Sequence, residues 1–365
     1  MSGAVCVCIE PAQLALEPCS ASAVITDVKT GDVLACVSYP GYDNNRLVNN
    51  MDTDYYAKLS TDKSSPFFNK ATQQTAAPGS TFKILSTIAG MSEGVIDDGT
   101  YINCTGSFDL VTPPISCWNK QGHGEIEIRE AIEQSCNSYF NMVGFKLGQD
   151  ADRNFSENRS LSVLQKYASE IGLDKKTGIE ITESAPHVSD SYAVPSYIGQ
   201  GTNAFSLSHI GRYVAALANR GSVYNLTLLD RVESADGTLI EENEADLYNQ
   251  VEIADSSWDA VQQGMMLVAD DTTSLNALSD LGLDVAGKTG TAQQSRSHPN
   301  HALFVGYAPA DNPEIAVAVR IANGYTSSNT AEAAADIFKY YFNLVDDEEI
   351  LTGTASGSSG QNIAD

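Results

Sequence analysis

The sequence predicts an α/β protein of the α+β type, in which one mostly antiparallel sheet is built from both chain ends and flanked by helices, with an all-helical subdomain inserted. Strand-like segments gather near the two ends, at 22–43 and after 284, whereas residues from about 100 to 275 follow a mostly helical pattern. With 365 residues, 42% of them hydrophobic and 19% charged, the chain is long enough for one large globular domain.

The predicted elements follow in order along the chain. Two strands flank the turn Lys29-Thr30-Gly31, and a polar, irregular stretch runs over 44–77. Pro78 and Gly79 precede a buried helix whose apolar residues recur at helical spacing. Further helices are predicted at 128–134, 138–148, 162–172 and 207–221, strands at 284–293, 301–309 and 314–322, and a closing amphipathic helix at 330–342.

The charge of the chain excludes two classes of partner. A net charge of −26 at pH 7 repels nucleic acid and anionic lipid headgroups, so we expect neither to bind. No stretch approaches the roughly 20 consecutive apolar residues of a membrane-spanning helix. Residues 1–11 are too short and lack the basic flank of a signal peptide, so we expect this chain as it stands to be soluble.

Residues 282–290 fit two motifs that imply different chemistry. Gly282, Gly287, Lys288 and Thr289 match the phosphate-loop pattern G-x-x-x-x-G-K-[ST], which requires a strand before its first glycine and a helix that starts at its lysine. Here the order is reversed, because the preceding residues favour a helix and Lys288 continues a strand. The same letters contain Lys288-Thr289-Gly290, the K-T-G motif of serine acyl-transfer enzymes that recognise penicillin.

Two partner motifs of the acyl-transfer reaction come earlier, in the expected order. Ser80 and Lys83 form an S-x-x-K, and if Ser80 opens a helix, the amine lies one turn on, within reach of the hydroxyl. Ser135-Cys136-Asn137 forms an S-x-N, for which we predict extended backbone, so that Ser135 and Asn137 face a cleft together while Cys136 faces the body.

Each motif alone has an ordinary structural explanation, such as a helix cap, a solvated lysine or a loop asparagine. K-T-G itself occurs twice more, at 29–31 and 176–178, where a turn and a loop explain it. The combination is more specific, because three short motifs occur in one order at intervals of about 55 and about 150 residues. We therefore favour acyl transfer over nucleotide binding.

In these motifs and in longer stretches the sequence resembles the transpeptidase domain of class B penicillin-binding proteins, most of all the elongation-type penicillin-binding protein 2. The stretches that carry the resemblance are VKTGDVLACVSYPGYD, APGSTFK, CWNKQGHG, EQSCNSYF, IGQG, GKTGTAQ and HALFVGYAPADNPEIAVAV. Residues 1–20 match the family poorly, and residues 21–351 are predicted to form the transpeptidase domain. The tail (352–365) is predicted to be disordered.

The resemblance implies an exported, membrane-anchored enzyme that cross-links peptidoglycan stem peptides ending in D-Ala-D-Ala, with its catalytic domain outside the cytoplasm. It further implies covalent inhibition by β-lactams, a glycosyltransferase partner in the elongation machinery, and no cofactor for catalysis. The family's membrane helix and elongated pedestal domain have no counterpart in this sequence.

The motifs assign a chemical role to each catalytic candidate. Ser80 would be the nucleophile, which needs a nearby base, and Lys83 is the candidate for that base. Lys83 must be neutral to accept a proton, a state that burial and a second cation, Lys288, both favour. Ser135 would relay the proton toward the leaving amine, and Asn137 would donate to an amide carbonyl of the substrate.

The strand motif supplies the expected substrate-binding residues, which are Thr289, Gly290 and Thr291. Lys288 and Thr291 would hold the terminal carboxylate of the substrate. The backbone N–H groups of Thr291 and Ser80 would stabilise the oxyanion, and Ser80 would do so from the start of its helix.

The chain also contains a candidate metal site. It has seven cysteines, an odd number that cannot all pair, and Cys104, Cys117, His123 and Cys136 form a Cys₃His set that zinc favours. The alternatives are ordinary buried cysteines, a Cys104–Cys117 disulfide or a surface histidine. The resemblance favours zinc, because some elongation-type members carry zinc at matching positions, and we expect it to be a structural ion that holds the S-x-N segment in register.

Other functions remain open within and beyond this chemistry. A β-lactamase or a D-Ala-D-Ala carboxypeptidase would use the same motifs, but no clear E-x-x-L-N follows the S-x-N motif to supply a deacylating glutamate, so we predict slow deacylation. A penicillin sensor, which acylates once without turnover, is the alternative from a different class.

Overall fold

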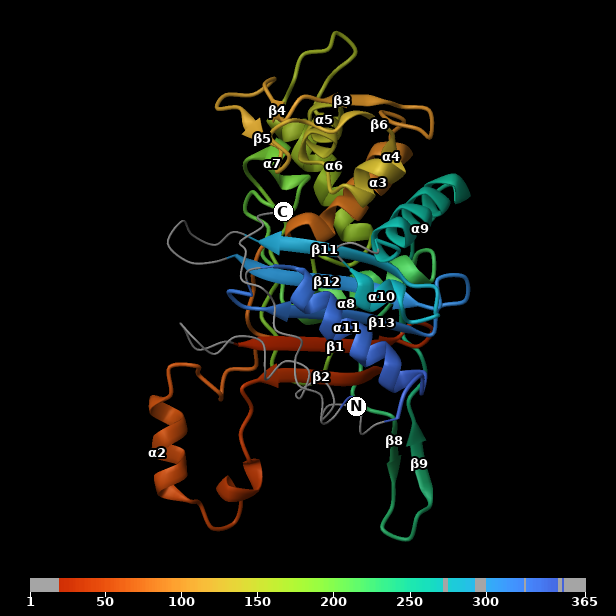
Figure 1. Cartoon of the computed structure of the whole chain (residues 1–365). Coiled ribbons are helices and arrows are strands. Elements are labelled where there is room, and N and C mark those ends of the chain that lie inside the picture. Colours follow the sequence, from red (N-terminus) through yellow and green to blue (C-terminus); the bar gives the residue numbers. More distant parts are fainter. Residues whose placement is uncertain (1–19, 272–274, 293–299, 325, 347–349, 351–365) are drawn as a thin grey trace.

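The computed structural model describes residues 20–271, 275–292, 300–324, 326–346 and 350. A five-stranded antiparallel sheet with the strand order β11-β12-β13-β1-β2 forms its centre (Figure 1). The strands are β1 (Ala21–Asp27), β2 (Val33–Tyr39), β11 (Ala286–Ala292), β12 (His301–Ala308) and β13 (Ile315–Ile321). The prediction of one sheet built from both chain ends is therefore confirmed. The predicted start (1–20, except Ser20) and the tail (352–365) lie outside the described residues.

Helices cover both faces of the sheet. Figure 1 shows α11 (Ser328–Tyr341) crossing the front of the sheet, while α8 (Leu207–Ala218) lies behind it. As a result every residue of β12 and β13 is buried, which is why these strands are nearly continuous runs of apolar residues. Gly211 brings α8 close to the sheet, because a Cβ there would lie 2.9 Å from a Val24 methyl group.

The inserted subdomain is mainly helical, whereas the sequence predicts an all-helical one. Its helices are α3 (Lys83–Ser92), α4 (Ile128–Glu133), α5 (Asn137–Leu147), α6 (Glu157–Glu170), α7 (Ala193–Ser196) and α9 (Asp255–Ala269). Among the described residues no helix is both long and apolar enough to span a bilayer.

Four small two-stranded sheets are absent from the prediction. They pair β3 (Ile102–Cys104) with β6 (Gly124–Ile126), β4 (Ser107–Phe108) with β5 (Ile115–Ser116), β7 (Ser222–Tyr224) with β10 (Leu247–Gln250), and β8 (Arg231–Glu233) with β9 (Leu239–Glu242). Strands of two to four residues are too short to show a period of two, so the sequence carries no clear signal for them.

The stretch 44–77 is less irregular than predicted. It contains a 3₁₀ helix, η1 (Asn44–Leu47), and the helix α2 (Thr53–Thr61), which begins after Asp52, whose carboxylate accepts from the backbone N–H of Tyr55. Only one residue of α2 is buried, so the apolar stripe that signals a helix is missing. Conversely, the helix predicted before Gly282 is reduced in the described residues to α10 (Asn276–Ser279).

The segment that leads from α2 into the first motif is anchored on two sides. From the sheet, the buried guanidinium of Arg320 donates to the backbone carbonyl of Lys70 at 2.8 Å. From the opposite side, the Thr72 hydroxyl donates to the carbonyl of Thr182 at 2.8 Å. These contacts tie residues 70–79 to elements far away in the sequence.

A buried polar network lies behind this anchored segment. The carboxylate of Glu183 accepts from the hydroxyls of Thr177 and Ser208, while the imidazole of His209 meets the hydroxyl of Ser206. Burial lowers the pKa of His209 to about 3. Its contact with Glu183 at 4.0 Å is therefore not an ion pair, because the imidazole is neutral near pH 7.

His209 gives the fold a predicted sensitivity to acid. An unfolded histidine titrates near pH 6.5, so below that pH the unfolded state binds a proton that native His209 does not. We predict that this residue removes stability as the pH falls from about 6.5 toward 3, with a limiting slope of about 1.4 kcal/mol per pH unit. Urea unfolding across this range should show a shallower pH dependence for His209→Asn than for the wild type. An equal slope in His209→Asn and the wild type would contradict the prediction.

Candidate active site

The first motif lies at a change of helix type. Ser80 belongs to the 3₁₀ turn η2 (Gly79–Phe82), and α3 starts at Lys83. In a 3₁₀ helix residues three apart eclipse each other, so Ser80 and Lys83 lie on the same side more strictly than in an α-helix. Ser80 is partly exposed, whereas Lys83 is fully buried.

The amine of Lys83 joins the first motif to the second. Its Nζ lies 2.7 Å from the carbonyl oxygen of Ser135, 3.1 Å from the Ser135 hydroxyl and 2.7 Å from Oδ1 of Asn137. The Phe140 ring lies nearby, with its centroid 5.8 Å from the amine. Residues more than 50 positions apart in sequence thus meet at one buried nitrogen.

Ser135 adopts a conformation that the sequence analysis did not foresee. The predicted extended backbone is wrong, because φ of Ser135 is +50°, in the left-handed region. Ser135 follows the C-cap of α4, its N–H donates to Ile132, and the N–H of Cys136 donates to Ala131. This is a Schellman motif, in which Ser135 occupies the position that usually holds glycine.

The Schellman turn nevertheless produces the orientation that was expected. Asn137 is the first residue of α5, Cys136 is its buried N-cap, and both Ser135 and Asn137 face Lys83. Left-handed backbone costs a non-glycine residue roughly 1–2 kcal/mol. This conformation directs both the carbonyl and the hydroxyl of Ser135 toward the amine of Lys83, so both groups can bond to it.

The third motif lies on the edge strand β11, beside η2. Lys288 and Gly290 are buried, whereas Thr289 and Thr291 are partly exposed, as the period of two in a strand requires. The Nζ of Lys288 donates to the carbonyl of Thr289 at 3.2 Å. Because Lys288 lies within a strand and not at the start of a helix, the structure excludes the phosphate-loop alternative.

Two glycines set the distance between η2 and β11, a packing role that the sequence analysis did not assign to them. A Cβ on Gly79 would lie 2.4 Å from the carbonyl oxygen of Thr291, and φ of Gly79 is +55°. A Cβ on Gly199 would lie 2.0 Å from the carbonyl oxygen of Gly79, whose N–H donates to Gly199 at 3.1 Å. Only glycine allows these three backbones to pack together, and the quoted stretches APGSTFK and IGQG contain the signal.

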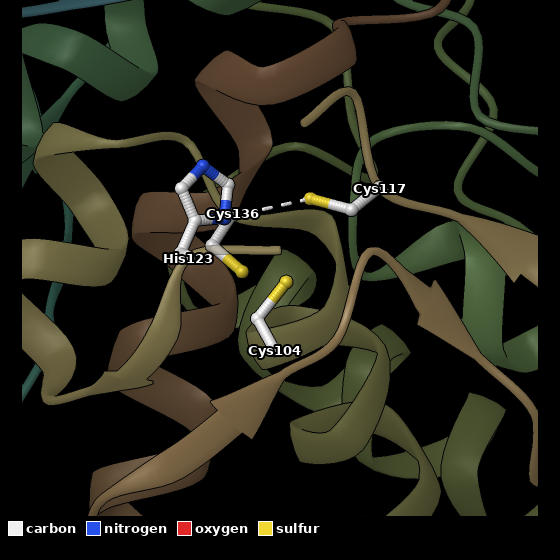
Figure 2. Close-up of side chains that lie close together, drawn as sticks. All are labelled: Cys104, Cys117, His123 and Cys136. Carbon is white, nitrogen blue, oxygen red and sulfur yellow. Dashed lines mark hydrogen bonds between the residues drawn. The ribbon is translucent and has the colours of Figure 1, made fainter. Parts of the chain in front are cut away.

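Four side chains from separate segments converge beside the S-x-N turn (Figure 2). Cys104 ends β3, Cys117 and His123 lie between β5 and β6, and Cys136 precedes α5. Their ligand atoms all lie within 4.8 Å of one another. These cysteines and Cys36 are free thiols, so the alternative of a Cys104–Cys117 disulfide is wrong. The other three cysteines lie outside the described residues.

The local field favours a thiolate in this cluster. The Cys136 thiol, together with the backbone N–H groups of Ser138 and Asn137 at the start of α5, donates to the sulfur of Cys117 and lowers its pKa to about 4. The same interaction, together with burial, raises the pKa of Cys136. A negative sulfur at a helix N-terminus is further stabilised by the helix dipole.

One pair in the cluster has the spacing expected around a tetrahedral ion, and all four ligand atoms lie within 4.8 Å of one another. Zinc binds sulfur at about 2.3 Å and nitrogen at about 2.0 Å, which places neighbouring ligand atoms about 3.5–3.8 Å apart. Cys117 Sγ and His123 Nδ1 lie 3.7 Å apart. Three thiols and one imidazole form a donor set typical of closed structural sites.

The antiparallel sheet, the helical insertion and the contacts of Lys83 with Ser135 and Asn137 agree with the class that the sequence predicts, the penicillin-recognising serine proteins. Residues 21–342 match the family model of the penicillin-binding protein transpeptidase domain. The chain belongs to this family, and within it to the class B, penicillin-binding protein 2 type.

Individual relatives agree with this assignment. The chain is 32% identical to the peptidoglycan D,D-transpeptidase MrdA of Haemophilus influenzae over 88% of this chain and 52% of the relative. The crystal structure of PBP2 from Pseudomonas aeruginosa in complex with WCK 5153 superposes with a TM-score of 0.80 at 27% identity, covering 94% of this chain and 74% of that one. PBP2 from Helicobacter pylori, in a complex with MreC, shares the fold with a TM-score of 0.75 at 21% identity, covering 89% and 60%. The chain spans about half the length of the MrdA relatives.

Because Ser135 occupies the glycine position of a Schellman motif, we predict that replacing it with glycine lowers activity without lowering stability. Glycine adopts φ of +50° without strain, so Ser135→Gly should unfold with a free energy equal to the wild type or up to about 1 kcal/mol higher. Loss of the hydroxyl should slow reaction with a fluorescent penicillin by about 100-fold or more. Both quantities can be measured on one preparation, by urea unfolding and by the rate of labelling.

Ser135→Ala is the matched control, since it removes the same hydroxyl and keeps the strain of the Cβ. It should react as slowly as Ser135→Gly and be less stable. If Ser135→Gly were less stable than Ser135→Ala, backbone strain at residue 135 would not explain the difference in the free energy of unfolding.

Proposed function

We propose that this chain is the catalytic unit of a peptidoglycan D,D-transpeptidase that forms a serine acyl-enzyme with D-Ala-D-Ala stem peptides and transfers the acyl group to a second stem peptide. The observation that carries the proposal is the buried amine of Lys83, held by Ser135 and Asn137 and one 3₁₀ turn from Ser80. The chemistry requires a base next to a hydroxyl nucleophile, and this arrangement supplies one.

In the proposed acylation, Ser80 Oγ attacks the carbonyl carbon of the penultimate D-Ala. Neutral Lys83 takes the hydroxyl proton as the C–O bond forms. The tetrahedral intermediate then breaks its C–N bond, and Ser135 passes a proton from Lys83 to the leaving amine of the terminal D-Ala. The amine of the second stem peptide then attacks the ester carbonyl, and the C–O bond to Ser80 breaks as the new C–N bond forms. Lys83 and Ser135 carry a proton from the attacking amine to the departing Ser80 oxygen, which restores the hydroxyl.

The strand β11 has the features of the substrate-binding side in this proposal. The partly exposed hydroxyls of Thr289 and Thr291 are suited to the terminal carboxylate, and Lys288 adds positive charge from the buried face. The contact of Gly79 with Thr291 supports an oxyanion hole formed by the backbone N–H groups of Ser80 and Thr291. The proposed carboxylate contacts differ from the expectation in one respect, because Lys288 and Thr291 point to opposite faces of the strand.

β-Lactams are the proposed inhibitors, since they mimic the substrate and acylate the same serine. A β-lactamase, a carboxypeptidase or a non-turnover sensor are alternatives with the same nucleophile. Repeated turnover of a D-Ala-D-Ala peptide with an amine acceptor separates the transpeptidase from the sensor, and a persistent penicillin adduct separates it from the β-lactamase.

For the whole protein, we propose a place in the cell-wall elongation machinery at the cytoplasmic membrane, with this domain on the outer side. The complex of the H. pylori relative with MreC supports a partner from that machinery. A glycosyltransferase that supplies the uncross-linked glycan strand is the partner implied by the reaction.

We further propose that Cys104, Cys117, His123 and Cys136 bind a structural zinc ion. The donor set, the free thiols and the position of Cys117 at the N-terminus of α5 support this assignment. The ion would join β3, the following loop and the S-x-N turn, so it would hold Ser135 and Asn137 in register and take no part in bond making.

The nucleophile can be tested by labelling with a fluorescent penicillin. The wild type should acquire one label that persists after removal of free penicillin, because no deacylating glutamate was identified. Ser80→Ala should acquire none, as intact-protein mass spectrometry would show. Ser162→Ala, which changes an exposed serine of α6, is the control and should label normally. Rapid loss of the wild-type label would instead favour a β-lactamase.

The metal can be tested by analysis of dialysed protein. The wild type should retain about one zinc ion per chain, and Cys136→Ser should lose it, with a lower melting temperature and acylation slowed about 10–100-fold. Cys36→Ser, which alters a free thiol in β2, should keep its zinc. If Cys136→Ser kept the full acylation rate and melting temperature, the ion would have no supporting role.

A further inference from the structure

We propose that Trp118 is a positioning residue for Ser135, acting through one hydrogen bond from its indole to the backbone of the preceding residue. The indole N–H donates to the carbonyl of Gln134 at 2.8 Å. This inference rests on the proposed function, because Ser135 matters only if acylation passes through it.

The accepting carbonyl sits at a sensitive point of the chain. Gln134 is the C-cap of α4, and the last carbonyls of a helix have no partner within the helix. The peptide group that joins Gln134 to Ser135 is planar, so fixing its carbonyl also fixes the direction of the Ser135 N–H. The hydrogen bond from the indole therefore fixes the orientation of the peptide group that precedes Ser135, and Ser135 adopts its left-handed φ relative to that group.

The same segment holds the other side of the turn. Asn137 Nδ2 donates to the carbonyl of Ser116 at 3.4 Å, two residues before Trp118. Ser135 thus lies between two residues that both bond to the 116–118 segment. A small shift at either contact would move the Ser135 carbonyl and hydroxyl relative to Lys83, to which they are bonded at 2.7 Å and 3.1 Å.

Packing alone does not account for a tryptophan at this position. The residue remains 36% exposed, and its ring centroid lies 5.1 Å from that of His123 in an edge-to-face arrangement with an interplanar angle of 62°. A phenylalanine could make that ring contact equally well. What only the indole adds is a donor directed at Gln134.

The proposal can be tested by removing the donor while keeping the ring. In Trp118→Phe we expect the first-order rate constant of penicillin acylation to fall about tenfold, while the dissociation constant of the initial complex, the zinc content and the melting temperature stay within error. The matched control is Trp258→Phe, which changes the chain's second tryptophan, buried in α9. It should acylate within twofold of the wild type even if it melts at a lower temperature.

A second variant covers the case in which Trp118→Phe disturbs the fold. Incorporation of 3-benzothienylalanine at position 118 replaces the N–H with sulfur in a ring of nearly the same shape, and it should reproduce the tenfold loss. Normal acylation by both variants beside an active wild type would overturn the role of Trp118 alone. A lower zinc content or a lower melting temperature in both variants would also overturn it, because the slower acylation would then result from disruption of the cysteine–histidine cluster. A wild type that does not acylate would overturn the proposed function itself, and this role with it.

Discussion

One buried amine organises the candidate site. Lys83 has no access to solvent, and a buried amine without hydrogen-bond partners is strongly unfavourable. Three oxygen atoms near it come from a single turn, two from Ser135 and one from Asn137. The turn between α4 and α5 must therefore keep its position relative to α3. The capping box at Glu127 and Glu130 fixes the start of α4, so this six-residue helix is capped at both ends.

Locally unfavourable backbone is concentrated where the three motifs meet. Ser135 takes a glycine-like conformation at the end of α4, and Gly79 and Gly199 allow backbones to approach where any side chain would collide. Such positions persist only when surrounding structure defines them strongly. Here the surroundings do so, since Arg320 and Thr72 anchor the segment before Ser80.

The cysteine cluster and Trp118 hold the far side of the same turn. Cys136 connects the turn to the cluster, while the indole of Trp118 connects Gln134 to the segment that carries Cys117. A closed metal site and a directed hydrogen bond both restrict motion without touching the substrate. In these two proposals, Cys136 and Gln134 would pass that restriction on to Ser135, which lies next to both of them along the chain.

The sequence by itself determined the sheet built from both chain ends, the helical insertion and the residue types of the site, because long periodic segments and ordered motifs survive in one dimension. It also determined that Cys104, Cys117, His123 and Cys136 form a plausible donor set. It could not give the short two-stranded sheets, whose strands have too few residues to show a period, nor helix α2, which buries only Leu59.

Only the tertiary structure decided how Ser135 faces Lys83, through a Schellman turn and not an extended strand. It likewise decided that Gly79 must be a glycine, because the colliding atom belongs to Thr291, more than 200 residues away. Contacts between distant segments leave no local pattern, so they become visible only when the chain is folded.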